Sequence, residues 1–424
     1  MRSVRSSQPA LAACQNFRRR SRSGYSRIRG EFMGQHEDVL SLIDEEWVAA
    51  QTLALVETPS ETMEEAVVCT QYADLMAEIG LEVDVREVTP RRNNLYARIR
   101  GAGDGPALVF NGHLDTIAIG DCVAPGRDGD TITGRGTTDM KGGMASLLGA
   151  AKAIVESGIR LEGDLWVTAV VGHEEPEADK DGPKAMIEDL NNGRLGGDRI
   201  LIVEGPDALW VMSMGSMVWT IEMTSPRGGT HTQYVPFSEN PIRFVGDLIQ
   251  RIHEWQGELE QGVVHPLAGA ERIDVGIVEA GDYFNRTPGT CRLVGTRRWS
   301  PGKTAGECLA ELEALTVEFA RQGGLESSVR MVHEREPFET PQSDPAVGAI
   351  ADAHRQITES EAGYIGMRIV GDANLYVHGS GIPTFYYGPC NETAHADNEW
   401  VSVKRLGDAS RVYALGAMNY CGVA

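Results

Sequence analysis

The fold class is decided by one stretch, Ala107-Leu108-Val109-Phe110-Asn111-Gly112-His113-Leu114-Asp115. Its first four residues form a short apolar run of the kind that buried parallel strands show. His113 follows almost directly, so its side chain should project from the end of a buried strand into a cleft. Open α/β sheets bind their ligands at that edge.

Similar runs on both sides of this stretch extend the pattern. Further buried strands are predicted at Leu165 to Val171, Ile200 to Val203 and Thr384 to Tyr387, with Leu81 to Val88 and Leu95 to Ile99 as an edge. Helices are predicted at His36 to Val56, Glu61 to Ile79, Met140 to Val155 and Pro345 to Thr358, and from about Val403. This alternation predicts an α/β fold with a mixed, mostly parallel sheet and helices on both faces.

A second unit interrupts the first, since 424 residues exceed what one core usually organises. From about Met212 the sequence pattern changes to four strand-like segments and two segments of helical periodicity. The strands are Val218 to Thr224, Arg272 to Ala280, Cys291 to Arg297 and Ser328 to His333; the helices are Pro241 to Trp255 and Ala305 to Gln322. We therefore predict an α+β domain at 212–333, inserted between 34–211 and 334–424.

The first 33 residues differ from the rest because they carry eight arginines and only one acid, Glu31. We expect residues 1–33 to be a disordered basic leader without catalytic role. An organellar transit peptide would have this composition. The alternative is an upstream start codon, with Met33 opening the chain proper.

Charge and composition exclude several classes of function. Removing the eight leader arginines takes the formal charge from −22 to −30, so the folded body is poorly suited to nucleic acid. No run approaches eighteen consecutive apolar residues, which argues against a membrane span. Seven cysteines without a CxxC pair fit a reducing compartment, and we expect a cytoplasmic location.

His113-Leu114-Asp115 has the spacing of a metal-binding imidazole with a supporting acid. Such an imidazole needs its second ring nitrogen oriented, and Asp115 can do this. A turn with a surface histidine would show the same three residues.

Asp139 lies in a glycine-rich loop, Gly134-Arg135-Gly136-Thr137-Thr138-Asp139-Met140-Lys141-Gly142-Gly143, directly before a predicted helix. Backbone can approach an ion closely there. Asp139 suits a carboxylate that bridges two ions, although an ordinary helix N-cap is the alternative.

Two adjacent acids follow a strand in Gly172-His173-Glu174-Glu175-Pro176. Neighbouring side chains leave a strand end in different directions, so one acid can bind metal while the other transfers a proton. Solvated acids at a strand end are the alternative. We interpret His173 as structural.

Glu204 closes the strand at Leu201 to Val203, and His395 lies near the C-terminus in Thr393-Ala394-His395-Ala396-Asp397-Asn398-Glu399. Imidazoles and carboxylates at several strand ends of one sheet match the ligands of zinc, manganese or cobalt. The sequence therefore predicts a hydrolytic site with one or two divalent metal ions.

These motifs, in this order over roughly residues 36 to 420, resemble the dinuclear metallohydrolase family of acetylornithine deacetylase, succinyl-diaminopimelate desuccinylase, aminoacylase and carboxypeptidase G. The resemblance implies a division of labour among the site residues. His113 and Glu204 would hold one ion, Glu175 and His395 the other, with Asp139 between them, Glu174 as general base and Asp115 orienting His113. Residues 34–211 and 334–424 would then be the metal-binding catalytic domain.

The inserted unit resembles the family's lid and dimerisation domain. The resemblance implies a homodimer through residues 212–333, in which His231 of Gly228-Gly229-Thr230-His231-Thr232 stabilises an oxyanion in the neighbouring subunit's site. It also implies substrate-binding roles for His231, Asn240 and Arg298, and a guanidinium pairs well with a substrate carboxylate. A surface histidine and a strand-end ion pair are the alternatives.

Some substrate-side positions depart from the family's usual pattern, namely Thr296, Arg297, Asn374 and Cys390. We expect metal-dependent C–N hydrolysis of a small carboxylate-bearing N-acyl amino acid or peptide-like substrate. The departures leave open hydrolytic deamination of an electron-poor aromatic amine, as in nitroanthranilate aminohydrolase. An inactive binding or scaffold relative is the alternative from another class.

Overall fold

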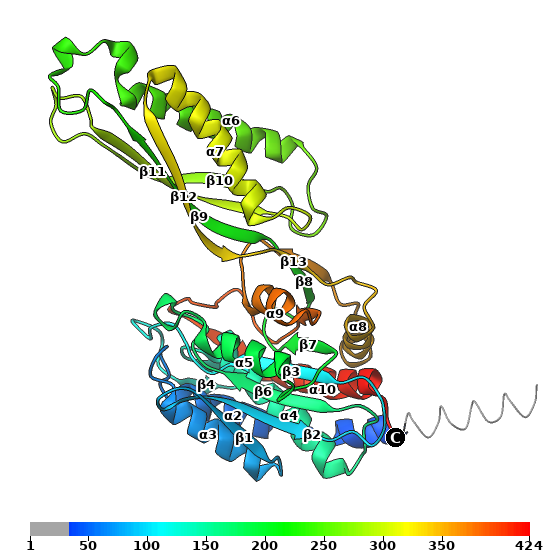
Figure 1. The fold of residues 1–424 in the computed structure, drawn as a ribbon. Helices are drawn as coiled ribbons and strands as arrows, with labels where there is room; N and C mark the ends of the chain where they lie inside the picture. The colour runs from blue at the N-terminus through cyan, green and yellow to red at the C-terminus, as the bar shows by residue number, and fades with distance from the viewer. Residues whose placement is uncertain (1–33) are drawn as a thin grey trace, which may run out of the picture.

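The computed structural model describes residues 34–424, which form two domains (Figure 1). The main domain contains a nine-stranded sheet, and the inserted domain contains a sheet of four strands. The predicted basic leader at 1–33 lies outside the described residues.

The centre of the main sheet is parallel, as predicted. β3 (Leu108–His113) pairs in parallel with β6 (Leu165–Val170) and with β7 (Arg199–Ile202). Beyond β7, β15 (Thr384–Tyr386) continues the parallel order. The sheet is completed at one edge by β1 (Val83–Thr89) and β2 (Arg92–Ile99), and at the other by β8 (Leu209–Ser213), β13 (Phe338–Glu339) and β14 (Tyr364–Met367).

Helices cover both faces of this sheet. Successive side chains of β3 point to opposite faces, so they pack against different helices. The Phe110 ring packs against Tyr413 of α10, whereas the Asn111 amide contacts Met186 of α5 on the opposite face. The first face carries α2 (Glu45–Glu57), α4 (Gly142–Ser157), α8 (Pro345–Thr358) and α10 (Val403–Cys421); the second carries α5 (Asp181–Asn191) and α9 (Asp372–Ser380) (Figure 1). α3 (Ala66–Glu78) packs near β1 and β2.

The inserted domain has its own core. Its strands follow the order β10 (Arg272–Ala280), β11 (Thr290–Trp299), β9 (Gly215–Thr224) and β12 (Glu326–Arg335), and α6 (Pro241–Gln261) and α7 (Ala305–Gly323) cover one face. From the first to the last of these strands the domain spans residues 215–335, and the range predicted from the sequence was 212–333. Met214 and Glu336 lie in the two chain segments that connect the domains.

Some elements differ from the sequence prediction. The helix expected at 36–56 is two helices, because residues 34–41 are helical and Asp44 then caps α2 by accepting hydrogen bonds from the amides of Glu46 and Trp47. Also not predicted from the sequence were α5, α9, the short strands β8, β13 and β14, and the three-stranded sheet of β4 (Gly126–Asp128), β5 (Thr131–Thr133) and β16 (Trp400–Ser402). The short length of these strands left no periodicity to detect.

Asn374 ties the connecting segments to the main domain. Its Nδ2 donates to the carbonyl of Glu336 at 2.7 Å and faces that of Met214 at 3.5 Å, while its Oδ1 accepts from the amide of Gly371. Asn374, one of the positions that depart from the resembling family's pattern, thus has a structural use at the hinge, the pair of segments that connects the domains.

Candidate metal centre

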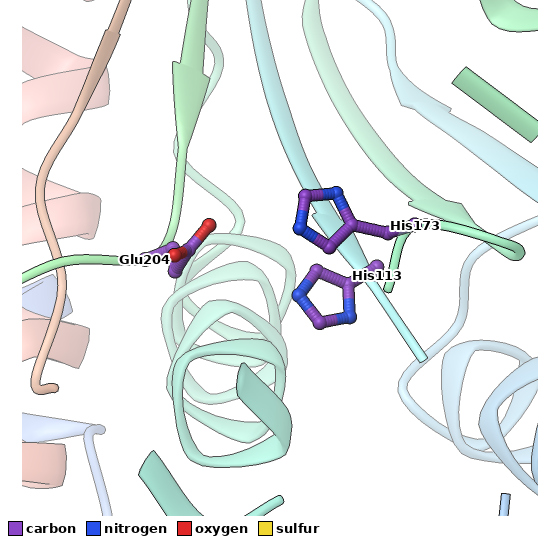
Figure 2. Close-up of side chains that lie close together, drawn as sticks. All are labelled: His113, His173 and Glu204. Atoms are coloured by element: carbon purple, nitrogen blue, oxygen red, sulfur yellow. The ribbon is translucent and has the colours of Figure 1, made fainter. Parts of the chain in front are cut away.

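The predicted site residues meet where neighbouring parallel strands end. His113 is the last residue of β3, Glu204 follows β7, and the turn that carries His173 and Glu174 follows β6. Figure 2 shows Glu204 facing the rings of His113 and His173. Potential ligand atoms of these three residues lie within 4.8 Å of one another, as do those of His113, Asp139 and Glu174.

Asp139 lies between the two predicted imidazole ligands. Its Oδ1 is 3.3 Å from His113 Nε2, and its Oδ2 is 3.2 Å from His395 Nε2. One carboxylate thus presents a different oxygen to each histidine, which is the arrangement a bridging carboxylate requires.

The residues fit a metal ion in spacing and in chemistry. His113 Nε2 and Asp139 Oδ1 are both buried and have no hydrogen-bond partner among the described residues. Two ligand atoms about 2.0 Å from one tetrahedral ion would lie about 3.3 Å apart, which matches their separation. An ion would satisfy both orphaned atoms.

The charges of the cluster also point to a cation. Burial, together with the nearby Asp139 carboxylate, raises the pKa of Glu204 to about 7. Burial alone would raise the pKa of Asp139 too, but His113 and His395 outweigh it and lower that pKa. A divalent ion would favour the ionised form of both acids.

His395 comes from the C-terminal loop, and its Nε2 also lies 3.2 Å from Glu174 Oε1. Its backbone has φ of +65°, a left-handed conformation that only a few per cent of non-glycine residues adopt. Glu399 in the same loop accepts hydrogen bonds from the amides of Gly136, Thr138 and Asp139. This buried glutamate, whose role the sequence analysis missed, fastens the His395 loop to the Asp139 loop.

The two adjacent glutamates have different surroundings. Glu174 is nearly buried, with 6% of its side chain exposed, and faces His395 and Asp139. The Glu175 side chain makes no hydrogen bond or ion pair with the other site residues in the part of the chain that the structure describes. Of the two acids, Glu174 is therefore the one that contacts His395, and the predicted ligand role of Glu175 stays a prediction.

Comparison with known proteins identifies the family. The model of peptidase family M20/M25/M40 matches residues 109–419. The chain belongs to this family. Among curated relatives, it is 25% identical to the N-formyl-4-amino-5-aminomethyl-2-methylpyrimidine deformylase of Bacillus subtilis, covering 88% of this chain and 93% of the relative. It is 28% identical to the succinyl-diaminopimelate desuccinylase of Methylorubrum extorquens, covering 85% and 95%.

Several solved structures have the same fold as this chain. Aminopeptidase PepT of Bacillus cereus matches with a TM-score of 0.75 and 18% identity over 90% of this chain and 100% of that one. A dinuclear metal-binding M20 peptidase of Bacillus subtilis matches with a TM-score of 0.66 and 15% identity over 88% and 97%. This M20 chain is thus a metal-dependent hydrolase. Among its described helices, none is long and apolar enough to cross a bilayer.

Asp115 supports the M20 centre differently from the prediction. His113 Nδ1 lies 2.9 Å from the backbone carbonyl of Asp115, whereas the carboxylate is 3.7 Å away. That carboxylate instead accepts hydrogen bonds from the amides of His173 and Glu174 and from the Thr62 hydroxyl. The carbonyl therefore orients the His113 ring, and the carboxylate holds the turn that carries Glu174.

Replacing Asp115 by alanine should lower metal affinity and kcat/KM by about 10- to 100-fold, because the amides of His173 and Glu174 lose their acceptor and Glu174 loses its position. Asp115→Asn keeps one acceptor oxygen and should retain more of both. Equilibrium dialysis with zinc and steady-state kinetics measure the effects. Unchanged metal affinity in Asp115→Ala would contradict this role.

A buried ion-pair network holds the same turn from behind. Arg92 donates to both oxygens of Glu65, at 2.7 and 2.9 Å, and also pairs with Asp181. Glu65 in turn accepts a hydrogen bond from the amide of Gly172. The residues that precede Glu174 are thereby fixed to α3 and β2.

Arg92→Met should reduce the free energy of unfolding by about 3–5 kcal/mol, because it leaves the fully buried Glu65 carboxylate unpaired. Urea unfolding followed by circular dichroism measures this loss. The double variant Arg92→Met/Glu65→Gln removes the uncompensated charge and should be more stable than Arg92→Met alone. If both variants unfolded like the wild type, the network would have no stabilising role.

The lid residues lie apart from this centre within one chain. β9 begins at the hinge and runs outward, so the loop that carries His231 lies at the remote end of the inserted domain (Figure 1). There His231 accepts from the amide of Gln233, and Asn240 caps α6. Arg298 pairs in register with Ser216, next to the hinge. Their predicted substrate roles stay predictions.

Two of the other departures from the family pattern, Arg297 and Cys390, have structural uses. Arg297 is fully buried, stacks over Trp255 and pairs with Glu271. The Cys390 thiol donates to the carbonyl of Thr138, beside Asp139. Tyr376, Tyr386 and Tyr387 near these positions are buried in the core of the main domain.

Proposed function

We propose that the chain hydrolyses the amide of a small carboxylate-bearing N-acyl amino acid or peptide-like substrate at a centre of two divalent ions. The observation that carries this proposal is the Asp139 carboxylate, with one oxygen toward His113 and the other toward His395. Zinc, manganese and cobalt all suit such nitrogen and oxygen ligands.

The proposed ligand sets follow from the contacts. His113 and Glu204 would hold one ion, Glu174 and His395 the other, and Asp139 would bridge them. This changes the prediction for the paired acids, since Glu174 takes the ligand place of Glu175. Glu174 Oε1 faces His395, and Oε2 makes no hydrogen bond within residues 34–424. That free oxygen can accept the proton of the attacking water, so Glu174 keeps the proton-transfer role.

When bound, the ions would lower the pKa of water and polarise the substrate carbonyl. The chain itself places Glu174 for proton transfer by fixing its backbone amide to Asp115 at 2.9 Å. The Glu174 carboxylate can then return the proton to the leaving nitrogen. Because water is the nucleophile, the reaction requires no covalent intermediate with the protein.

The substrate class is proposed from the lid and from the relatives. Arg298 lies at the hinge end of the inserted sheet, and its Nη1 is buried without a hydrogen-bond partner in the described chain. A substrate carboxylate would supply that partner. The names of the two curated relatives describe removal of a formyl and a succinyl group. Small acyl groups on nitrogen are therefore the first substrates to test.

The test combines metal removal with a substrate panel. Protein stripped by chelation and reloaded with zinc, manganese or cobalt should regain hydrolysis of at least one N-acyl amino acid or dipeptide. An anthranilate-type amine in the panel checks the alternative chemistry. Full activity in the stripped protein would reject the proposal.

We also propose a homodimer through the inserted domain. Its outer end exposes Tyr234, Phe237, Tyr283 and Phe284, with Phe284 86% exposed. Aromatic side chains at this density favour protein contact, and a partner chain would let His231 reach the neighbouring site. Light scattering should give twice the 46.0 kDa chain mass, and Phe237→Glu/Phe284→Glu should give the monomer.

A cytoplasmic location stays a prediction.

Metal binding should release at least one proton per chain at pH 7.5. Hydrogen bonds with Asp139 and Glu174 raise the pKa of metal-free His395 to about 10, so its imidazole is protonated, yet a ligand imidazole must be neutral. Metal affinity should therefore fall as the pH is lowered from 9 to 6. Titration calorimetry in two buffers of different ionisation enthalpy measures the release, and identical heats would contradict it.

A further inference from the structure

His173, interpreted from the sequence as structural, lies inside the proposed centre. Its ring stacks on that of His113 with centroids 4.1 Å apart and planes within 11°. Figure 2 shows that each ring turns a nitrogen toward Glu204. The potential ligand atoms of the three residues lie within 4.8 Å of one another, so a third imidazole shares the space of the predicted ligands.

Both rings are oriented in the same way from behind. His113 Nδ1 lies 2.9 Å from the carbonyl of Asp115, and His173 Nδ1 lies 2.8 Å from Asp372 Oδ2. The second contact is close but not aligned as a regular hydrogen bond. In each case Nε2 is the nitrogen left for the centre. An oxygen behind a ligand imidazole is the usual support of a metal-binding histidine.

A purely structural ion pair explains less of this arrangement. A buried pair of His173 and Asp372 would need neither Glu204 nor a second imidazole in front of it. Two histidines and one glutamate are the protein ligands of several catalytic zinc sites.

We propose that His173 is a ligand of the ion that His113 and Glu204 hold, and that Asp372 is its positioning residue. This inference rests on the proposed function, because it assumes an ion on the Glu204 side. It adds one side chain to the predicted ligand set and gives α9 a role, since Asp372 begins that helix.

The test measures metal binding rather than turnover. His173→Ala should weaken binding of one ion by at least about 100-fold, and Asp372→Asn by about 10- to 100-fold. Zinc per chain after dialysis, competition with a chromogenic chelator, and the visible spectrum of the cobalt-loaded protein measure these effects. The cobalt spectrum of His173→Ala should change, because a nitrogen ligand is lost.

Two further variants keep the result interpretable. His354→Ala removes another buried imidazole, one that contacts the Tyr387 hydroxyl outside the site, and should bind zinc like the wild type. His173→Gln keeps a polar side chain near Asp372 and serves if the alanine variant fails to fold by circular dichroism.

The outcomes separate this inference from the proposed function. If the wild type binds two ions and both folded His173 variants keep its affinity and cobalt spectrum, the inference is wrong while the dinuclear centre stands. If the wild type itself binds no ion, the proposed function fails, and the inference with it. Selective loss of one ion in the His173 variants supports both.

Discussion

Asp139→Ala should leave the chain without a stable pair of ions and lower kcat/KM by on the order of 10⁴-fold. Asp139 is the only residue whose two oxygens face both His113 and His395 within the described chain, at 3.3 and 3.2 Å. Removing it takes one ligand from each ion at once. It also leaves two imidazoles without their nearest carboxylate.

Metal analysis by mass spectrometry and steady-state kinetics on the best panel substrate measure this loss. Asp179→Ala is the matched control, because Asp179 is 89% exposed and, among residues 34–424, forms an ion pair only with Lys184. It should retain both ions and full activity. An Asp139→Ala protein with two tightly bound ions would contradict the bridging role.

Glu174→Gln should lose the ion on the His395 side and lower turnover by at least about 10³-fold. The amide keeps the size of the side chain but is a poor ligand and cannot accept the water proton. Glu174 Oε1 lies 3.2 Å from His395 Nε2, so the substitution also breaks the pairing that positions this imidazole.

Glu175→Gln is the paired control, since the Glu175 side chain points to no other predicted ligand in the described contacts. It should bind both ions. If Glu174→Gln instead kept both ions and lost only turnover, Glu174 would be a general base alone, as predicted from the sequence. If Glu175→Gln lost an ion, the predicted ligand role of Glu175 would be restored.

The sheet could be predicted because its central strands are continuous apolar runs. Leu108–His113 and Leu165–Val170 are buried on both faces, and such strands carry their signal in composition alone. The break between residues 41 and 45 could not be seen in the same way, because helical periodicity continues across it. Only the Asp44 cap marks the second start.

The site was predictable where a motif combines residue type with a strand end, as at His113 and Glu204. The roles of Glu174 and Glu175 were not, since they depend on which way two adjacent side chains leave one turn. Asp372 and Glu399 were missed for a different reason. Asp372 contacts His173, 199 positions away, and Glu399 contacts Asp139, 260 positions away. The local sequence carries no signal for contacts between such distant residues.

The separation of the metal ligands along the chain has a consequence for biosynthesis. His113 leaves the ribosome long before His395, which is 282 residues later, yet the proposed bridging role of Asp139 requires both imidazoles. A nascent chain therefore cannot trap a full pair of ions until translation is almost finished. Any truncation before the last thirty residues, by nonsense mutation or proteolysis, should yield a product unable to compete for scarce cellular metal.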